Sequence, residues 1–274
     1  MVKNFRNQSE TSSCKRIWNP KPTLTPALSL GERGLKNYNF MQKELVKKIL
    51  SETESGYDLI AEKFSQTRNR FWKELEFIGE FVKEGDNVLD FGCGNGRLLE
   101  LFKNKKIKYA GADVSEKLIQ KADANKSSFE KTEASFLKIE NDFKKLPFGE
   151  NYFDAVYSIA VFHHIPGSEK RLEIACELYR LAKKNSFIVI TVWNLWQPRY
   201  RKNVFANWKN KILGKSELDW NDCWITFTDN QGQVFKRFHH AFTIIDLKKL
   251  FGKAGFKIIR CEKIKGNLVL VGKK

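Results

Sequence analysis

The stretch from Asn87 to Arg97 constrains the fold of this chain more than any other part of the sequence. An apolar run ends at the acid Asp90 and is followed by three glycines in alternate positions, Gly92, Gly94 and Gly96. A pattern with helical spacing begins directly after the last glycine. Glycine tolerates backbone conformations that other residues avoid and leaves room for a ligand beside the main chain. The stretch therefore predicts a strand, a tight turn and a helix start, with a ligand site at the turn.

Hydrophobic periodicity predicts that strands and helices alternate along the chain. The expected helices are 41–64, 71–82, 96–103, 115–124, 168–182 and 243–254, the third following the glycine turn and the fourth capped by Ser115. The expected strands are 87–91, 109–114, 136–139, 153–161, 187–193, 256–261 and 268–271, the last two forming a hairpin. This alternation indicates an α/β fold with helices on both faces of a largely parallel sheet, whose ligands bind at the carboxyl ends of the strands. Asp90, Asp113 and the segment from Ser158 to His164 all lie at such ends.

Composition limits the domain organisation and the partners. Residues 1–40 combine Ser, Thr, Pro and Gly with little periodicity and are predicted to be disordered, whereas 41–274 is predicted to form one domain with an insertion at about 194–240. A formal net charge of +17 favours a polyanionic partner. The five cysteines have no disulfide or zinc spacing, and no apolar run is long enough to span a membrane, so we expect a cytoplasmic protein without metal.

The glycine turn differs from the turn that binds a dinucleotide. Its glycines alternate, whereas the spacing G-x-G-x-x-G places a pyrophosphate at a helix N-terminus. Asp90, two residues before the first glycine, would repel a pyrophosphate but could hold an ammonium group. S-adenosylmethionine has an ammonium group and a sulfonium but no phosphate, so the turn favours this cofactor over NAD.

Further cofactor contacts are predicted beyond the turn. Asp113 ends the second strand, where a carboxylate can accept both ribose hydroxyls. Asp142 and Phe143 are candidates for the adenine amino group and ring, although a solvent-exposed loop would have a similar sequence. Ser158 is placed at the end of the fourth strand. Tyr57, in a helix before the sheet, is expected to close over the cofactor, although a core aromatic residue would look the same in the sequence.

Taken together, these motifs resemble the class I S-adenosylmethionine-dependent methyltransferases. The residues that carry the resemblance are Asp90 to Gly96, Gly111-Ala-Asp113, Leu146-Pro-Phe148, Phe153-Asp-Ala-Val156 and His163-His164. The resemblance extends from about Tyr57 to the C-terminus. It implies a seven-stranded, Rossmann-like sheet that ends in an antiparallel hairpin, and S-adenosylmethionine as methyl donor.

A narrower resemblance is to the tRNA methyltransferases that esterify a carboxymethyl group on the wobble uridine. It rests on the segments 57–68, 158–164, 192–193 and 237–242. The usual Pro-Gly pair before the fifth strand is replaced here by residues 183–186, and 194–233 matches no pattern of that family. The resemblance implies a tRNA substrate and, as for some tRNA methyltransferases, a small activating protein partner.

Catalysis of methyl transfer requires alignment and exclusion of water more than a dedicated catalytic dyad. A carboxylate acceptor is already ionised at neutral pH and needs no general base. For a hydroxyl acceptor, His163 or His164 would be the candidate base, and at least one of the two is expected to line the pocket. The other reading of this pair is packing and capping of the turn.

The predicted substrate-binding residues combine cations and aromatic rings. Five of the seven tryptophans lie between Trp193 and Trp224, among basic residues that include Arg199 and Arg201, as single-stranded RNA binding would require. Packing of the insertion is the alternative for each tryptophan. Arg68, His164 and Arg237 are further candidates, the two arginines for a phosphate or a substrate carboxylate or, equally, for structural ion pairs. Two other functions stay open: a methyltransferase for a small molecule or lipid, and an inactive RNA-binding scaffold.

Overall fold

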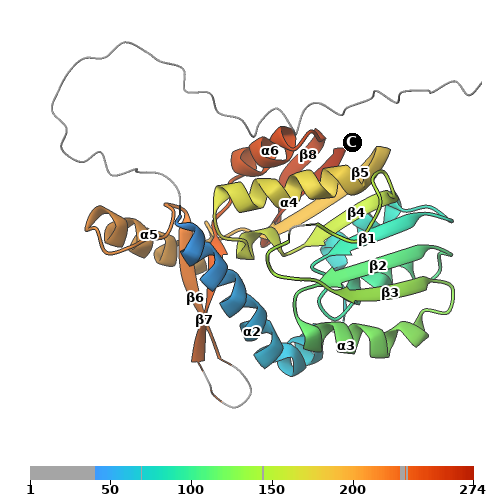
Figure 1. Cartoon of the computed structure of the whole chain (residues 1–274), viewed down its shortest axis with the longest axis horizontal. Coiled ribbons are helices and arrows are strands. Elements are labelled where there is room, and N and C mark those ends of the chain that lie inside the picture. Colours follow the sequence, from blue (N-terminus) through green and yellow to red (C-terminus); the bar gives the residue numbers. More distant parts are fainter. Residues whose placement is uncertain (1–40, 69, 144, 229–231, 233) are drawn as a thin grey trace, which may run out of the picture. The chain divides into compact units, whose positions relative to one another are not determined.

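A seven-stranded sheet forms the centre of the computed structural model, which describes residues 41–68, 70–143, 145–228, 232 and 234–274 (Figure 1). The predicted extension 1–40 lies outside the described residues. The strand order is β3-β2-β1-β4-β5-β9-β8, and β9 runs antiparallel to both of its neighbours. The bounds are β1 Asn87–Phe91, β2 Lys108–Asp113, β3 Glu133–Lys138, β4 Phe153–Ile159, β5 Ala182–Trp193, β8 Lys257–Ile264 and β9 Asn267–Lys273. The predicted fold class, a parallel sheet ending in an antiparallel hairpin, is confirmed.

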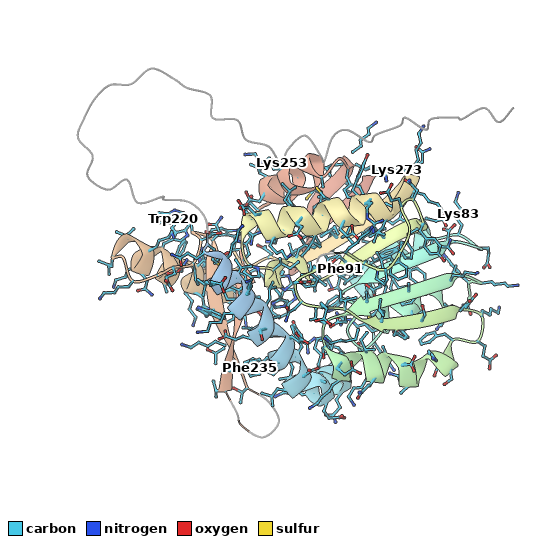
Figure 2. The ribbon with its side chains drawn as sticks, in the orientation of Figure 1. Lys83, Phe91, Trp220, Phe235, Lys253 and Lys273 are labelled. Carbon is cyan, nitrogen blue, oxygen red and sulfur yellow. The ribbon has the colours of Figure 1, made fainter. Side chains whose placement is uncertain are left out.

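Two hydrophobic cores lie on the two faces of this sheet. The helices α4 (Ser168–Leu181) and α6 (Ile244–Lys253) cover one face, where Leu178 and Phe251 are fully buried. The elements η2 (Lys73–Phe81) and η3 (Arg97–Phe102) cover the other face with Leu75 and Phe102. Figure 2 shows Phe91 in the interior and the labelled lysines at the periphery. The sheet is thus buried on both faces, as a parallel sheet requires.

Both η2 and η3 are 3₁₀-helices, whereas the sequence predicts ordinary α-helices there. In η2 the large apolar residues recur every three positions, which matches the three residues per turn of a 3₁₀-helix. The fourth predicted strand also ends two residues early, because Ala160 has a φ of 61° and turns the chain into the short 3₁₀-helix η5 (Phe162–His164). This turn brings both histidines of the pair to the carboxyl end of the sheet.

The insertion after Trp193 contains regular structure that the sequence pattern does not predict. Helix α5 (Pro198–Ile212) packs beside a separate two-stranded sheet of β6 (Asp222–Thr228) and β7 (Val234–His240) (Figure 1). Trp196 and Trp208 pack around the small core of this insertion, and Trp224 packs against Phe238. These three tryptophans hold the insertion together, whereas Trp220 is 48% exposed. The packing interpretation is therefore correct for most of the tryptophan cluster.

Helix α2 (Lys43–Thr67) runs from the insertion to helix α3 (Glu116–Asn125) (Figure 1). Asp58 of α2 accepts hydrogen bonds from Ser115 Oγ at 2.6 Å and from the Lys117 amide at 3.1 Å. Ser115 Oγ in turn accepts from the Leu118 amide, which confirms the predicted cap of α3. These bonds hold α2 across the carboxyl ends of the strands.

Among the described helices, none has both the length and the apolar character needed to cross a bilayer.

The close packing of β2 against β3 can be tested at Gly111. A Cβ at this position would lie 2.6 Å from the Phe136 ring and 2.9 Å from Cys93 Sγ. We expect Gly111→Ala to lower the free energy of unfolding by about 1–3 kcal/mol, measured by urea denaturation. Gly252→Ala in α6 is the control, because a Cβ there meets nothing within 4 Å, so its stability should be unchanged or higher. Equal stability of the Gly111→Ala variant and the wild type would contradict this packing.

Candidate functional site

The glycine turn forms the floor of a pocket at the carboxyl end of β1. Gly92, Gly94 and Gly96 have φ values of 78°, 55° and 76°, which side chains other than glycine rarely tolerate. The Gly92 amide donates to the Ala112 carbonyl oxygen at 2.7 Å, so the turn is fixed to the end of β2. A Cβ on Gly92 would lie 2.2 Å from Val161, a residue of the pocket wall. Gly92 and Gly94 line the pocket, whereas Gly96 lies behind it against Phe136.

Asp113 lies beside this turn, at the end of the neighbouring strand. Its Oδ2 accepts from the Gly94 amide at 2.8 Å and its Oδ1 accepts from the Ser115 amide at 2.9 Å. Burial raises the pKa of Asp113, and these amide donors oppose the rise. Each carboxylate oxygen can accept a further hydrogen bond. Asp113 lines the pocket and is therefore positioned to accept hydroxyl groups of a ligand there.

Asp90 lies below the turn rather than in the pocket wall. It is 2% exposed, and its Oδ2 accepts a hydrogen bond of 2.5 Å from the Tyr109 hydroxyl. Its Oδ1 is buried and makes no hydrogen bond with the described residues. Burial raises the pKa of Asp90 to about 7, with the Tyr109 hydrogen bond acting in the opposite direction. A cationic group close to Asp90 would restore its ionised form.

Helix α2 forms one wall of the pocket. Leu50, Thr53, Tyr57 and Phe64 all line it, at helical spacing along the same face. The Tyr57 hydroxyl lies 2.8 Å from His164 Nε2. The prediction that Tyr57 closes over the pocket is consistent with this position, and the helix supplies the apolar surface that excludes water.

The opposite wall contains residues adjacent to several predicted ones. Asn141 and Phe143 line the pocket, but Asp142, between them, does not. Ser158 is fully buried within β4, and the lining residues there are the next three, 159–161. Asn141 donates to Glu54 Oε2 at 2.6 Å, which links this loop to α2. The structure therefore brings Phe143 but not the side chains of Asp142 and Ser158 to the pocket.

Two lining residues, Trp72 and Arg97, are absent from the sequence-based predictions. The guanidinium carbon of Arg97 lies 3.8 Å from the centre of the Trp72 ring. Arg97 directly follows the last glycine of the turn, so its place in the sequence already indicates that it lies close to the predicted ligand site. Trp72 precedes η2, and no local pattern distinguishes it from a core aromatic residue.

Three arginines, Arg68, Arg97 and Arg237, surround the pocket. Within the described part of the chain, none of them forms an ion pair with a carboxylate. Burial, followed by the positive charge of Arg68, lowers the pKa of Arg97 to about 10. Burial likewise lowers the pKa of Arg68. Partly desolvated cations without a counter-ion are stabilised by an anion, so the pocket lining around these arginines is suited to a carboxylate or phosphate.

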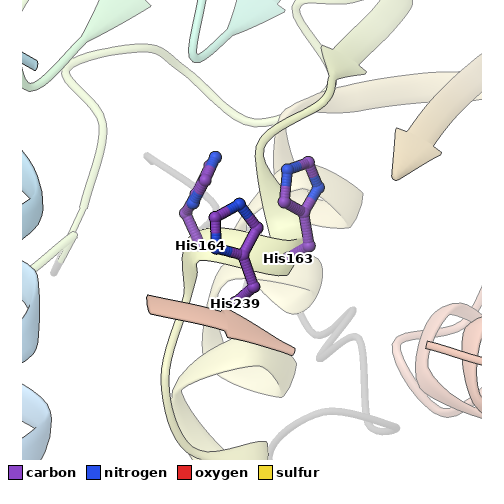
Figure 3. Close-up of side chains that lie close together, drawn as sticks. All are labelled: His163, His164 and His239. Atoms are coloured by element: carbon purple, nitrogen blue, oxygen red, sulfur yellow. The ribbon is translucent and has the colours of Figure 1, made fainter. Parts of the chain in front are cut away.

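Three buried histidines lie next to these arginines: His163 and His164 of η5 and His239 of β7 (Figure 3). Nδ1 of His164 lies 3.0 Å from the Phe238 carbonyl oxygen and Nδ1 of His239 lies 3.0 Å from that of Arg237. Both Nδ1 atoms therefore carry the proton, which leaves Nε2 of each ring as an acceptor. Nε2 of His239 has no hydrogen-bond partner among the described residues.

The electrostatic environment keeps these histidines neutral. Burial, followed by the positive charge of Arg237, lowers the pKa of His164 to about 3. Burial also lowers the pKa values of His163 and His239 well below their ordinary value. One ring nitrogen of each histidine lies within 4.8 Å of the corresponding nitrogens of the other two. At this spacing neutral imidazoles could bind a cation. Arg237 would repel a metal ion, and the absence of metal stays a prediction.

The predicted substrate residues divide between two openings. His164 and Arg237 line the pocket, whereas Arg68 and Trp193 also line a second, adjacent groove together with Arg199. Arg201 is exposed on α5 and lines neither opening. The structure thus brings together residues from the end of α2, η5, β5, β7 and α5 that are far apart in the sequence.

Comparison with known proteins identifies the family. Residues 62–260, more than half of the chain, match a family described as a methyltransferase domain. The chain belongs to this methyltransferase family. The fold resembles a solved S-adenosylmethionine-dependent methyltransferase from Methanosarcina mazei with a TM-score of 0.60 and 22% identity, over 75% of this chain and 98% of that one. The predicted methyl donor, S-adenosylmethionine, is the one that the name of this solved methyltransferase gives.

Two further similarities bear on substrate and partner. The tRNA (carboxymethyluridine(34)-5-O)-methyltransferase alkbh8 of Xenopus tropicalis is 34% identical over 190 residues, 69% of this chain and 26% of that protein. The chain therefore spans about a quarter of the length of this relative. A methyltransferase in a complex with the Trm112 methyltransferase activator of Haloferax volcanii has a TM-score of 0.57 and 20% identity, over 81% of this chain and 96% of that one.

The residues of the pocket fit S-adenosylmethionine. Below the turn and outside the pocket wall, Asp90 Oδ1 is a buried acceptor without a partner among the described residues, which a nearby ammonium group could satisfy. Asp113 faces the pocket beside glycines at which added side chains would fill the space. Apolar side chains of α2 and of the loop at Phe143 enclose the remainder. The sequence-based assignment of Asp90, Gly92, Gly94 and Asp113 to the cofactor is consistent with this geometry.

Asp113→Ala tests the ribose assignment. Loss of a charged hydrogen-bond acceptor should weaken S-adenosylmethionine binding by at least about 10-fold, measured by isothermal titration calorimetry. Asp123→Ala is the matched control, because Asp123 is an exposed residue of α3 paired with Lys126. The melting temperature of each variant shows whether the fold is intact. Unchanged affinity of a folded Asp113→Ala protein would refute the assignment.

Asp90→Asn tests the electrostatics below the turn. Because the pKa of Asp90 is raised to about 7, the folded carboxyl keeps a proton that the unfolded one releases from about pH 4 upwards. The free energy of unfolding of the cofactor-free protein should therefore fall as the pH rises from about 4 to 7. An asparagine side chain does not titrate, so the Asp90→Asn variant does not lose this stability. The free energy of unfolding of the variant minus that of the wild type should therefore be larger by roughly 2–4 kcal/mol at pH 8 than at pH 4.

The same Asp90→Asn variant should bind S-adenosylmethionine more weakly, because the amide cannot neutralise an ammonium group. Thermal unfolding at both pH values and calorimetric titration at pH 8 measure the two effects. A stability difference that does not depend on pH would contradict the raised pKa.

Proposed function

We propose that this chain transfers a methyl group from S-adenosylmethionine to the carboxylate of a modified uridine at position 34 of tRNA. The observation that carries the proposal is the presence of three arginines without carboxylate partners among the described residues in the lining of the cofactor pocket. An anionic acceptor would be held there. The name of the Xenopus tropicalis relative supports the choice of a carboxymethyl group on a tRNA nucleoside.

The histidines support a carboxylate rather than a hydroxyl acceptor. A general base is most effective when its pKa lies near the working pH. The pKa of His164 is about 3, so its ring is a very weak base at neutral pH. A carboxylate acceptor needs no base, because it is ionised at that pH. His164 would then position Tyr57 and the acceptor rather than accept a proton.

The chain would act mainly by binding and orientation. The glycine turn, Asp90 and Asp113 would hold S-adenosylmethionine, which when bound supplies an electrophilic methyl group on its sulfonium. Arg68 and Arg237 would orient the acceptor carboxylate from the opposite side. Tyr57 and Phe64 would exclude water from the space between them. Alignment of this kind converts an encounter in solution into a reaction within one complex.

A basic surface on the insertion is suited to the tRNA backbone. Arg199, Arg201 and Lys202 are exposed at the start of α5, and Lys209 lies two turns further along this helix. Lysine and arginine contacts to phosphates dominate the affinity of such complexes. The sequence-based prediction of tRNA binding by this region therefore becomes part of the proposal.

A small activating protein is proposed as a second partner. The support is the fold similarity to the methyltransferase that was solved with the Trm112 activator. Assays of this chain should therefore be performed with and without such an activator.

A cytoplasmic location, where tRNA modification takes place, also stays part of the proposal.

Arg237→Gln tests the acceptor side of the pocket. Loss of one charged hydrogen bond to the acceptor should lower kcat/KM for tRNA by about 10- to 100-fold. Binding of S-adenosylmethionine should stay unchanged if Arg237 contacts only the acceptor. The matched control is Arg260→Gln, because Arg260 is a surface residue of β8 paired with Glu262. An unaffected rate in the Arg237→Gln protein would contradict the assignment.

Nucleoside mass spectrometry of cellular tRNA tests the function as a whole. Cells that lack the gene should lose one methyl-ester uridine derivative and accumulate the corresponding carboxylic acid. Restoring the wild-type gene, but not the Asp113→Ala variant, should reverse the change. An unchanged set of tRNA nucleosides would redirect the search to small-molecule acceptors.

A further inference from the structure

A second groove opens beside the cofactor pocket. Arg68, Trp72 and Trp193 line both spaces, so the two are adjacent. The other walls come from the start of α5 and from the turn of the C-terminal hairpin, where Gly266 and Asn267 lie. Anything that enters the acceptor side of the pocket therefore has a neighbouring space in which its continuation can lie.

Aromatic rings offer stacking surfaces along this groove. Trp193 and Tyr200 lie 6.0 Å apart between ring centres, with an angle of 25° between their planes. Arg199 lies over the Tyr200 ring at 5.3 Å, and Trp72 also lines the groove. Tyr200 and Trp193 are only partly buried. Planar aromatic rings beside arginines are the surfaces on which single-stranded bases stack.

The charge of the groove favours a phosphodiester. Arg68 and Arg199 are its cations, and neither forms an ion pair within the described residues. Glu74 is the one acidic lining residue, and it lies 3.7 Å from Lys265 Nζ. The net charge of the lining is therefore positive even before the lysine is counted. An anionic linkage between two nucleosides would lie next to both arginines.

A side-chain amide without a hydrogen-bond partner lines the same space. Asn267 is 7% exposed as a residue, and its side-chain amide makes no hydrogen bond with the described residues, while its polar atoms stay accessible. Gln197 uses its amide nitrogen to donate to the carbonyl oxygens of Asn194 and Gly266, which leaves its side-chain oxygen as an acceptor. Side-chain amides of this kind pair with the edges of bases.

We propose that this groove binds the nucleotide adjacent to the methylated one, with its base on Tyr200 and Trp193, its edge at Asn267 and its phosphate near Arg68 and Arg199. The inference rests on the proposed function, because it takes the acceptor to be part of an RNA chain. The groove would explain a preference among substrates. The chain would prefer a polynucleotide to a free nucleoside because only the polynucleotide fills both the pocket and the groove.

The test measures how one substitution, Tyr200→Ala, changes the activity toward substrates of different length. Wild-type protein and Tyr200→Ala are assayed with an anticodon stem-loop, a trinucleotide and a free nucleoside, each carrying 5-carboxymethyluridine as the acceptor. Loss of one stacked base should raise KM for the two RNA substrates by roughly 5- to 150-fold. KM for the free nucleoside and the affinity for S-adenosylmethionine should be unchanged. Tyr152→Ala is the control, because Tyr152 is an exposed aromatic residue that lines neither space.

Two outcomes would overturn the proposal. Equal effects of Tyr200→Ala on nucleoside and RNA would place Tyr200 in the acceptor pocket, and no effect on either would leave the groove without a role. Asn267→Ala, checked for folding by its melting temperature, gives a second measurement of the same preference.

Binding of the fluorescently labelled stem-loop separates this inference from the proposed function. If wild-type protein methylates none of the substrates but Tyr200→Ala still weakens RNA binding, the proposed function is wrong and the assignment of the groove to RNA is still supported. If Tyr200→Ala binds the stem-loop as tightly as the wild type, the groove assignment fails whatever the activity.

Discussion

The hydrogen bond from the Gly94 amide to the Asp113 carboxylate connects the parts on which the site depends. It joins the turn after β1 to the end of β2 across 2.8 Å, and the second oxygen of Asp113 accepts from Ser115 at the start of α3. Ser115 in turn donates to Asp58 of α2. One carboxylate thus links the glycine turn, a cover helix and the wall of the pocket. The left-handed glycines make this arrangement accessible without backbone strain.

Charge is distributed unevenly around the pocket that this network forms. Asp90 and Asp113 lie on the cofactor side, both with a pKa that burial raises. Arg68 lines both the pocket and the groove, and Arg97 and Arg237 line the pocket, all without carboxylate partners in the described residues. A cationic donor would find opposite charge at the two acids and an anionic acceptor at the arginines. The protein would therefore favour the reacting pair by position and electrostatics, without a proton-transfer residue.

The sequence predicts the parts of this site that are local. The strand, the alternating glycines and Asp113 follow from spacing, because the carboxyl ends of adjacent parallel strands must meet. His164 was expected from its place at the end of a strand, whereas Tyr57, Arg68, Trp193 and Arg237 were expected from their residue chemistry and from resemblance to a family, since no periodicity relates residues so far apart. The structure places all five around the pocket.

Other parts of the site could not be predicted from the sequence. Asp142 and Ser158 were expected at the cofactor, but the neighbouring Asn141 and Ile159 line the pocket instead, because a shift of one residue turns a side chain away. Trp72 carries no signal that separates it from core residues. In the insertion, tertiary packing of Trp196 and Trp208 creates order where periodicity indicates none.

The most direct test of the central claim is the chemical stability of the product. Purified protein, with and without a small activating partner, is incubated with tRNA and S-adenosylmethionine that is radiolabelled in the methyl group. If the acceptor is a carboxylate, mild alkali should release the label from the tRNA as volatile methanol, because the product is an ester. Label that stays on the nucleoside after alkali would show a methylated nitrogen, carbon or ribose oxygen and would contradict the account.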